Sequence, residues 1–256
     1  MATMNDDHDT RPPPVALGRR LLAEALGTGL LVAVVVGSGI AAQRLSPHDV
    51  GLQLLENSVT TALGLSVLIL LFGPVSGAHF NPVVTAADWI IGRRSRSGTV
   101  GPHVGLYVVA QTAGGILGAL LADAMFGVAP AISAKARVDP GTLLGEVVAT
   151  AVLVLLVLSL AATGRGDLAA PAVGAYIGAA YWFTSSTSFA NPAVAVARMF
   201  SDTFAGIAPG SVVPFVLAQL VGGTVGIALT LLLFPAASRA ADRVVLPHPP
   251  ADEATL

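Results

Sequence analysis

The chain has 256 residues, of which 54% are hydrophobic and only 11% are charged, whereas soluble proteins carry about 25% charged residues. The mean hydropathy is +0.77. The absence of cysteine excludes a disulfide framework and thiolate chemistry. The net charge of −2, without a basic block, gives no support for a nucleic-acid partner. This composition predicts an all-α integral membrane protein.

Six apolar stretches follow one another along the chain, each close to the length that a helix needs to cross ~30 Å of hydrocarbon. The fifth looks short. Two further apolar segments are too short to span, so they must be buried in protein or line a cavity. The spans cover 17–42, 52–73, 103–127, 142–163, 170–184 and 212–235, and the short segments cover 81–92 and 191–200.

The spans predict a single channel domain over residues 16–236, between polar tails at 1–15 and 237–256. We expect the segments 1–15 and 245–256 to be disordered. If the N-terminus lies inside, nine of the Lys and Arg residues lie on the cytoplasmic side and four outside. This bias predicts a multi-pass protein of the plasma (inner) membrane with both termini in the cytoplasm. The outer four are Arg44, Lys135, Arg137 and Arg198.

Two Asn-Pro pairs interrupt the apolar sequence, Asn81-Pro82 and Asn191-Pro192, 110 positions apart. Asn caps a helix, and Pro fits the first helical position, where no amide donor is needed. Each pair therefore predicts a helix that begins inside the membrane protein.

The chain also repeats itself. The pattern Ala-Gln-x-x-Gly-Gly-x-x-Gly occurs at 110–118 and again at 218–226, and Glu24 and Glu146 each precede a Thr by four residues. Three spans in each half is an odd number, so the halves 16–127 and 141–236 must insert in opposite senses. This is an inverted repeat, whose functional site we expect near the midplane.

These residues resemble the aquaporin and glycerol-facilitator family, also called major intrinsic proteins. The resemblance implies six transmembrane helices plus two re-entrant half-helices, a channel without enzyme activity, cofactor or bound metal, and a homotetramer. The matching motifs are Ala23-Glu24-x-x-Gly27-Thr28, Ser76-Gly77-Ala78-His79-Phe80-Asn81-Pro82, Tyr107-x-x-Ala110-Gln111-x-x-Gly114, Glu146-x-x-x-Thr150 and Asn191-Pro192-Ala193.

The pore centre is expected where the two half-helices meet, each contributing roughly half a positive charge from its free amide donors. This field favours partly negative oxygen atoms on a solute and opposes cations. We expect the asparagine amides to donate to small neutral solutes and water. The residues of this centre are Asn81, Pro82, Asn191, Pro192 and Ala193.

The resemblance also implies a constriction on the outer side, formed by four residues. Counting along the chain gives Thr61, Ser188 and Val194 for three of them. The fourth, in the fifth span, is Trp182 when counted from Pro171 and Ala179 when counted back from the second Asn; we favour Trp182.

The chain departs from the family at two places. The first motif ends in Val83 instead of Ala, and Val194 stands where the family usually has Arg. A branch of the family linked to arsenic resistance is similar in having an apolar residue there. Without that Arg we expect a filter that is wider and more apolar. Arg198 either reaches the outer vestibule or, the reading that the sequence favours, lies at the lipid headgroups.

The remaining polar residues within the spans are expected to be structural. Glu24 and Glu146 should accept donors from the half-helix loops, because an acid exposed to lipid is costly. Gln111 and Gln219 should join helices, and His79 should brace the cytoplasmic mouth rather than gate it.

The sequence therefore predicts a passive channel for small uncharged solutes such as glycerol, urea or metalloid acids, with or without water. One alternative is a channel for arsenicals (arsenite or methylated arsenicals) in detoxification. Another is a proton-coupled secondary transporter that uses Glu24 or Glu146, since inverted repeats with broken helices suit transporters too. The spans carry few other ionisable groups for coupling, and no grouping of catalytic residues suggests an enzyme.

Overall fold

The computed structural model describes residues 15–93 and 98–235, and this part of the chain contains helices and no strands. The predicted tails, 1–15 and 237–256, therefore lie outside the described residues, except for Val15. The helices are α1 (Leu17–Leu45), α2 (Val50–Ser76), α3 (Pro82–Gly92), α4 (Gly101–Met125), α5 (Pro140–Ala162), η1 (Gly166–Leu168), α6 (Ala169–Phe183), α7 (Pro192–Ala197), η2 (Arg198–Phe200) and α8 (Pro209–Leu233).

Five helices (α1, α2, α4, α5 and α8) are long and apolar enough to cross a membrane. The fifth predicted span, 170–184, corresponds to α6, which has 15 residues and is as short as the sequence indicated. At about 1.5 Å per residue, α6 alone reaches roughly 22 Å. The all-helical membrane fold is thus confirmed, with helix ends within a few residues of the predicted ones.

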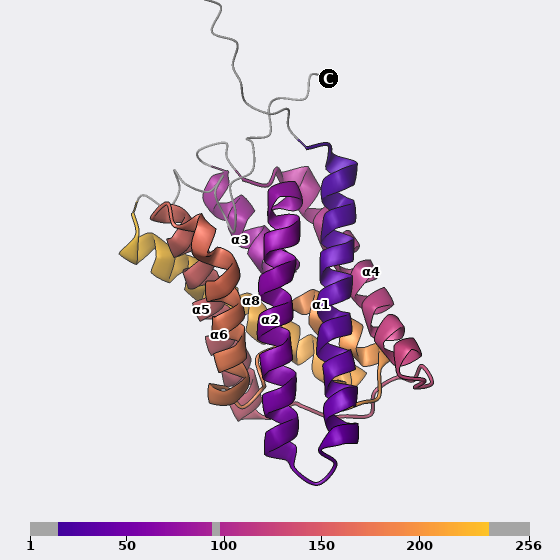
Figure 1. Cartoon of the computed structure of the whole chain (residues 1–256). Helices are drawn as coiled ribbons and strands as arrows, with labels where there is room; N and C mark the ends of the chain where they lie inside the picture. The colour runs from indigo at the N-terminus through magenta and orange to yellow at the C-terminus, as the bar shows by residue number, and fades with distance from the viewer. Residues whose placement is uncertain (1–14, 94–97, 236–256) are drawn as a thin grey trace, which may run out of the picture.

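Successive long helices run in opposite directions, so α1 begins and α8 ends on the same face, which is uppermost in Figure 1. We call this the terminal face. The loop 126–139 runs along the other face, which we call the opposite face. Figure 1 also shows α3 in the upper half of the bundle and the orange segment with α7 and η2 in the lower half, behind α1 and α2. The two half-helices therefore enter from opposite faces.

The two halves of the chain make matching contacts: α1 packs on α4 as α5 packs on α8, and α2 meets α6 between the halves. Glycine allows the first two crossings, because a Cβ at Gly118 would lie 1.9 Å from the Gly29 carbonyl oxygen on α1. At the matching Gly226 it would lie 2.5 Å from the Ala151 oxygen on α5. The repeated glycines thus set the same close backbone approach in each half.

Candidate pore

Each half-helix begins with an asparagine cap. The Oδ1 atom of Asn81 accepts a hydrogen bond from Val83 N at 2.9 Å. The Oδ1 atom of Asn191 accepts from Ala193 N at 3.0 Å and from Val194 N at 3.3 Å. A proline follows each cap at the first helical position. Both caps satisfy amide donors that a helix start leaves unpaired.

The two caps also hold each other's loops. Nδ2 of Asn81 donates to the carbonyl oxygen of Ala190 at 2.7 Å. Nδ2 of Asn191 donates to the carbonyl oxygen of Phe80, also at 2.7 Å. Each amide carries two N–H donors, so one donor of each side chain is left for a solute. The two helix starts therefore form one polar point inside the bundle.

The loops that precede the half-helices carry several non-glycine residues with left-handed backbone angles, with φ between 47° and 61°. Such angles cost roughly 1–2 kcal/mol per residue, so surrounding contacts must hold them. The residues concerned are Ala78, Phe80, Thr187, Ser188 and Ala190.

Glu24 holds the first loop. It is fully buried and accepts the backbone N–H groups of His79 at 3.0 Å and Phe80 at 2.8 Å. The Ser76 hydroxyl donates to it at 2.6 Å, and Gln111 Nε2 donates at 2.7 Å. Both carboxylate oxygens are thus occupied by donors from the loop and from α4.

Glu146 holds the second loop in the same manner. It accepts from Phe189 N at 2.8 Å and Ala190 N at 2.9 Å, and Gln219 Nε2 donates to it at 2.6 Å. The two glutamines are therefore partners of the glutamates, a pairing that spacing along the sequence does not indicate.

A cavity of about 60 Å³ is lined by both asparagines. Its wall is mostly apolar and is completed by the two loops with left-handed backbone angles that precede the half-helices. The lining residues are Leu31, Val35, Thr61, Leu65, Ile69, Ala78, His79, Phe80, Asn81, Val84, Leu153, Val157, Val173, Ile177, Tyr181, Ser188, Phe189, Ala190, Asn191, Val194 and Arg198.

Three of the four predicted filter residues line this cavity: Thr61, Ser188 and Val194. The Ser188 hydroxyl is buried and has no partner among the described residues, so it is available to a solute. The fourth, Trp182, does not line the cavity. Tyr181 does, and its hydroxyl lies 3.2 Å from Thr61 Oγ1.

The assignment of Trp182 therefore needs correction. Trp182 is 51% exposed, and its Nε1 donates to Oγ of Ser58 on α2 at 3.0 Å. The other candidate, Ala179, is also exposed. A step of one residue turns a side chain by about 100° around a helix. Of the three candidates, Tyr181 faces the cavity, because it follows Ile177, another lining residue, by four positions.

Arg198 also differs from the interpretation favoured by the sequence. Its side chain is 3% exposed and lines the cavity, rather than lying at the headgroups. Its Nε donates to the Ala205 carbonyl oxygen, and its guanidinium lies 3.5 Å from the centre of the Phe189 ring. Although Val194 stands directly after Asn191-Pro192-Ala193, the cavity therefore still contains an arginine, Arg198.

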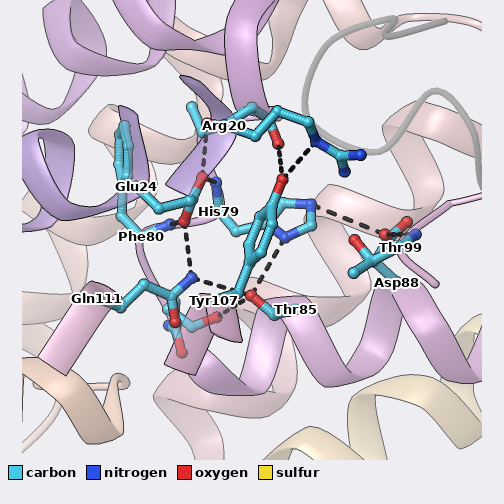
Figure 2. A network of polar contacts seen from close by, with 12 residues as sticks. Arg20, Glu24, His79, Phe80, Thr85, Asp88, Thr99, Tyr107 and Gln111 are labelled. Carbon is cyan, nitrogen blue, oxygen red and sulfur yellow. Dashed lines mark hydrogen bonds and ion pairs between the residues drawn. The ribbon is translucent and has the colours of Figure 1, made fainter. Parts of the chain in front are cut away.

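His79 lies at the end of the cavity nearer the terminal face, and Figure 2 shows its surroundings. Its Nδ1 is 3.1 Å from Thr85 Oγ1, which itself donates to the Asn81 carbonyl oxygen. Nε2 lies 3.9 Å from Oδ2 of Asp88, which also accepts Thr99 N at 2.6 Å. The ring is braced on both sides.

Tyr107 extends this network toward the terminal face (Figure 2). Its hydroxyl accepts from Arg20 Nε at 2.8 Å and donates to the Ser76 carbonyl oxygen at 3.2 Å. The sequence did not assign a role to Arg20 or to Asp88. Within residues 15–93 and 98–235, no three His, Asp or Glu side chains are grouped to hold a metal ion.

Comparison with known proteins gives consistent matches. A family model described as "Major intrinsic protein" matches residues 14–190. Aquaglyceroporin AqpS of Rhizobium meliloti (strain 1021) is 49% identical over 214 residues, covering 83% of this chain and 89% of the relative. A glycerol uptake facilitator protein of Pseudomonas aeruginosa is 35% identical over 117 residues, covering 46% of this chain and 39% of that protein.

Among solved structures, the X-ray structure of the aquaglyceroporin from Plasmodium falciparum matches with a TM-score of 0.60 and 18% identity. The match covers 86% of this chain and 96% of that one. At this identity the match shows the fold alone.

Proposed function

Because the chain belongs to the major intrinsic protein family, we propose that it passes small uncharged solutes larger than water, such as glycerol, urea or metalloid acids, with or without water. Membership makes it a multi-pass membrane channel for small solutes rather than an enzyme. Two of the relatives, an aquaglyceroporin and a glycerol uptake facilitator, are named for polyol transport, which favours polyols as solutes.

The observation that carries the proposal is the meeting of two capped helix starts at one cavity. Both helix starts direct partial positive charge at that point. The remaining amide donors of Asn81 and Asn191 can bind a hydroxyl or carbonyl oxygen in passing. Apolar residues such as Val35 and Val157 line the rest and offer a solute few competing hydrogen bonds.

The proposed filter consists of Thr61, Tyr181, Ser188 and Val194, with Arg198 beside them. Val194 gives a shorter, apolar wall than an arginine at that position would. The other three residues carry hydroxyl groups: those of Thr61 and Tyr181 are paired with each other, and that of Ser188 has no partner among the described residues. Such a ring suits a solute with an apolar side and several hydroxyls, as glycerol has.

A channel for arsenicals remains the second candidate. Undissociated arsenous acid carries three hydroxyls on one small centre and resembles a polyol in its hydrogen bonding. Val194 in the position after Ala193 supports this candidate. Uptake of arsenite and uptake of glycerol, both measured in vesicles that contain the purified protein, compare the two solutes directly.

The geometry of the two glutamates argues against a proton-coupled transporter. The oxygens of Glu24 and Glu146 accept backbone and side-chain donors that hold the loops. Protonation would compete with those donors and loosen the loops, so neither glutamate is free to carry protons.

Two further features belong to the proposal. The Lys and Arg distribution supports cytoplasmic termini, so that the opposite face is the outer one. Large apolar side chains on the outside of the bundle, among them Leu63, Leu117 and Leu232, suit a surface of lipid and of neighbouring copies in a homotetramer.

The test is light scattering from vesicles that contain the purified protein, under osmotic gradients of glycerol, urea or sorbitol. We expect downhill glycerol flux that does not saturate and does not depend on a pH gradient. Uphill accumulation driven by protons would contradict a channel.

A further inference from the structure

Thr85, in the first turn of α3, is a junction of three polar contacts (Figure 2). Its Oγ1 lies 3.1 Å from Nδ1 of His79 and donates to the Asn81 carbonyl oxygen at 3.1 Å. Nε2 of Gln111 donates to the same Oγ1 at 3.0 Å. A hydroxyl has one donor and two acceptor positions, which these three contacts can fill. One side chain therefore joins the pore asparagine, the pore histidine and the glutamine of α4.

Thr85 itself is not part of the cavity wall. Its side chain is fully buried and does not line the cavity, whereas two of its partners, His79 and Asn81, do line it. Its third partner, Gln111, also donates to Glu24 at 2.7 Å, and Glu24 holds the loop that carries His79. An effect of Thr85 on a passing solute must therefore act through a neighbouring side chain.

The inverted repeat supplies a comparison for this hydroxyl. Ala195 follows Asn191 by four residues, as Thr85 follows Asn81. A methyl group can form none of the three contacts, yet α7 begins with the same asparagine cap, and a glutamate holds its loop in the same manner. A half-helix of this fold thus begins without such a hydroxyl, so the hydroxyl of Thr85 has another role.

The contact that distinguishes the first half is the one with His79. The equivalent residue of the second half is Phe189, which also precedes its asparagine by two positions and lines the cavity. A phenyl ring has no hydrogen-bonding atoms, and that of Phe189 packs edge-on against Phe215, with ring centres 5.3 Å apart. The hydroxyl is therefore present in the half whose pore residue is polar and missing from the half whose pore residue is apolar.

Thr85, Asp88 and Tyr107 surround the imidazole ring of His79 (Figure 2). Thr85 meets Nδ1, Oδ2 of Asp88 lies 3.9 Å from Nε2, and the Tyr107 ring lies beside the imidazole with centres 5.6 Å apart. Of these three contacts, the one with Thr85 is at hydrogen-bond distance, and Thr85 is itself fixed to Asn81. The orientation of the ring is thus tied to the half-helix that carries the pore asparagine.

We propose that Thr85 is a positioning residue for permeation: its hydroxyl holds the His79 ring against the cavity wall and so sets the width of the pore between Asn81 and the terminal face. The inference rests on the proposed function, since it concerns the same channel. It adds a second point of solute selection, on the other side of the two asparagines from the proposed filter.

Loss of the hydroxyl should change permeation through the freedom of the ring. Side chains occupy discrete rotamers, so a ring released from Thr85 spends part of its time in rotamers that project into the cavity. The cavity has a volume of about 60 Å³, and an imidazole that turns into it takes space that a polyol needs. Water, which is smaller, should be less affected.

The experiment measures glycerol and water flux in vesicles, divided by the amount of folded protein. Thr85→Val keeps the shape of the side chain without its hydroxyl, and we expect its glycerol flux to be about fivefold lower than that of the wild type. Thr85→Ser keeps the hydroxyl and should restore the flux. Thr230→Val is the matched control, because Thr230 is also fully buried but donates within its own helix, to the Gly226 oxygen, and does not line the cavity.

A double-mutant cycle shows whether Thr85 acts through His79. In a His79→Ala background, Thr85→Val should cause no further fall in glycerol flux, because the ring that it releases is missing. An equal fall in both backgrounds would overturn the proposal and assign the effect to the contact with Asn81 or Gln111.

Nitrogen NMR of the histidine rings gives a readout that does not depend on flux. The signals of His79 are identified by their loss in His79→Ala. In the wild type and in Thr85→Ser, a fixed ring should give two separate signals of one tautomer, whereas in Thr85→Val the signals should move toward the average of a mobile ring. If Thr85→Val does not fold, averaged signals in the wild type overturn the proposal and separate signals support it.

The outcomes separate this inference from the proposed function. Absence of glycerol flux in the wild type contradicts the glycerol channel, and the ring signals then decide whether Thr85 fixes His79. Equal glycerol flux in Thr85→Val and the wild type overturns the positioning role and leaves the channel standing. An equal fall in Thr230→Val also overturns it, because loss of any buried hydroxyl would then suffice.

Discussion

Asn81 and Asn191 exchange hydrogen bonds across the centre of the protein, each donating at 2.7 Å to a backbone oxygen in the loop that precedes the other. The same side chains cap their own half-helices through Oδ1. The position of each half-helix thus depends on the other.

An Asn191→Asp substitution tests this dependence. The carboxylate keeps the cap but cannot donate to the Phe80 oxygen, and an unpaired buried acceptor costs about 1–3 kcal/mol. We expect a lower thermal unfolding midpoint and about a tenfold lower glycerol flux. Asn57→Asp is the control, because Asn57 does not line the cavity and donates to Val35 O and Ser38 Oγ. It should lower stability while leaving flux per folded channel unchanged.

Glu24→Gln and Glu146→Gln should destabilise the chain without revealing proton coupling. An amide can accept through only one of its two terminal atoms, so at least one loop N–H would lose its partner, at about 1–3 kcal/mol. We expect a lower unfolding midpoint in both variants. The folded fraction should still conduct glycerol independently of a pH gradient. If the wild type accumulated glycerol with a proton gradient and the variants lost this accumulation, the glutamates would be proton carriers.

Tyr181 and Trp182 form a matched pair of neighbouring aromatic residues. Tyr181 lines the cavity and Trp182 is half exposed outside it. Tyr181→Ala should widen the proposed filter and raise the flux of sorbitol relative to glycerol, whereas Trp182→Ala should leave this ratio unchanged. Osmotic swelling in the two polyols measures it, and the reverse ranking would restore Trp182 to the filter.

Val194→Arg should close the channel to larger solutes. Val194 is 5% exposed and lines the same cavity as Arg198, so a second guanidinium there would fill space and repel the first. We expect glycerol flux to fall at least about tenfold, with water flux less affected. Val194→Leu, which adds volume without charge, separates the two causes. Unchanged glycerol flux in the Arg variant would remove Val194 from the filter.

The sequence predicted the features that depend on local pattern. The spans follow from the length of the apolar segments. Each Asn-Pro pair begins a half-helix because the asparagine cap and the proline act on the first helical turn itself. Glu24 and Glu146 were expected to accept donors from the loops, and such bonds are present. In each case the residue type itself dictates the local structure.

The features that the sequence missed depend on how distant segments meet. Trp182 was chosen by counting forward from Pro171, and an error of one residue turns the side chain away from the cavity. Arg198 was expected among the lipid headgroups. The Ala205 oxygen that it binds comes near it only when the chain folds back after η2. The meeting of Lys135 and Arg137 with residues 204–206 likewise joins segments almost 70 positions apart.

The exchanged bonds of the asparagines also set an order of events during synthesis. Residue 81 leaves the ribosome 110 residues before residue 191 does, so α3 has its cap but lacks the Ala190 oxygen that Asn81 binds in the finished protein. The first half of the chain cannot complete its own pore wall while it is being made. The wall of the cavity is therefore complete only when residues of the second half, Phe189 and Asn191 among them, have joined those of the first.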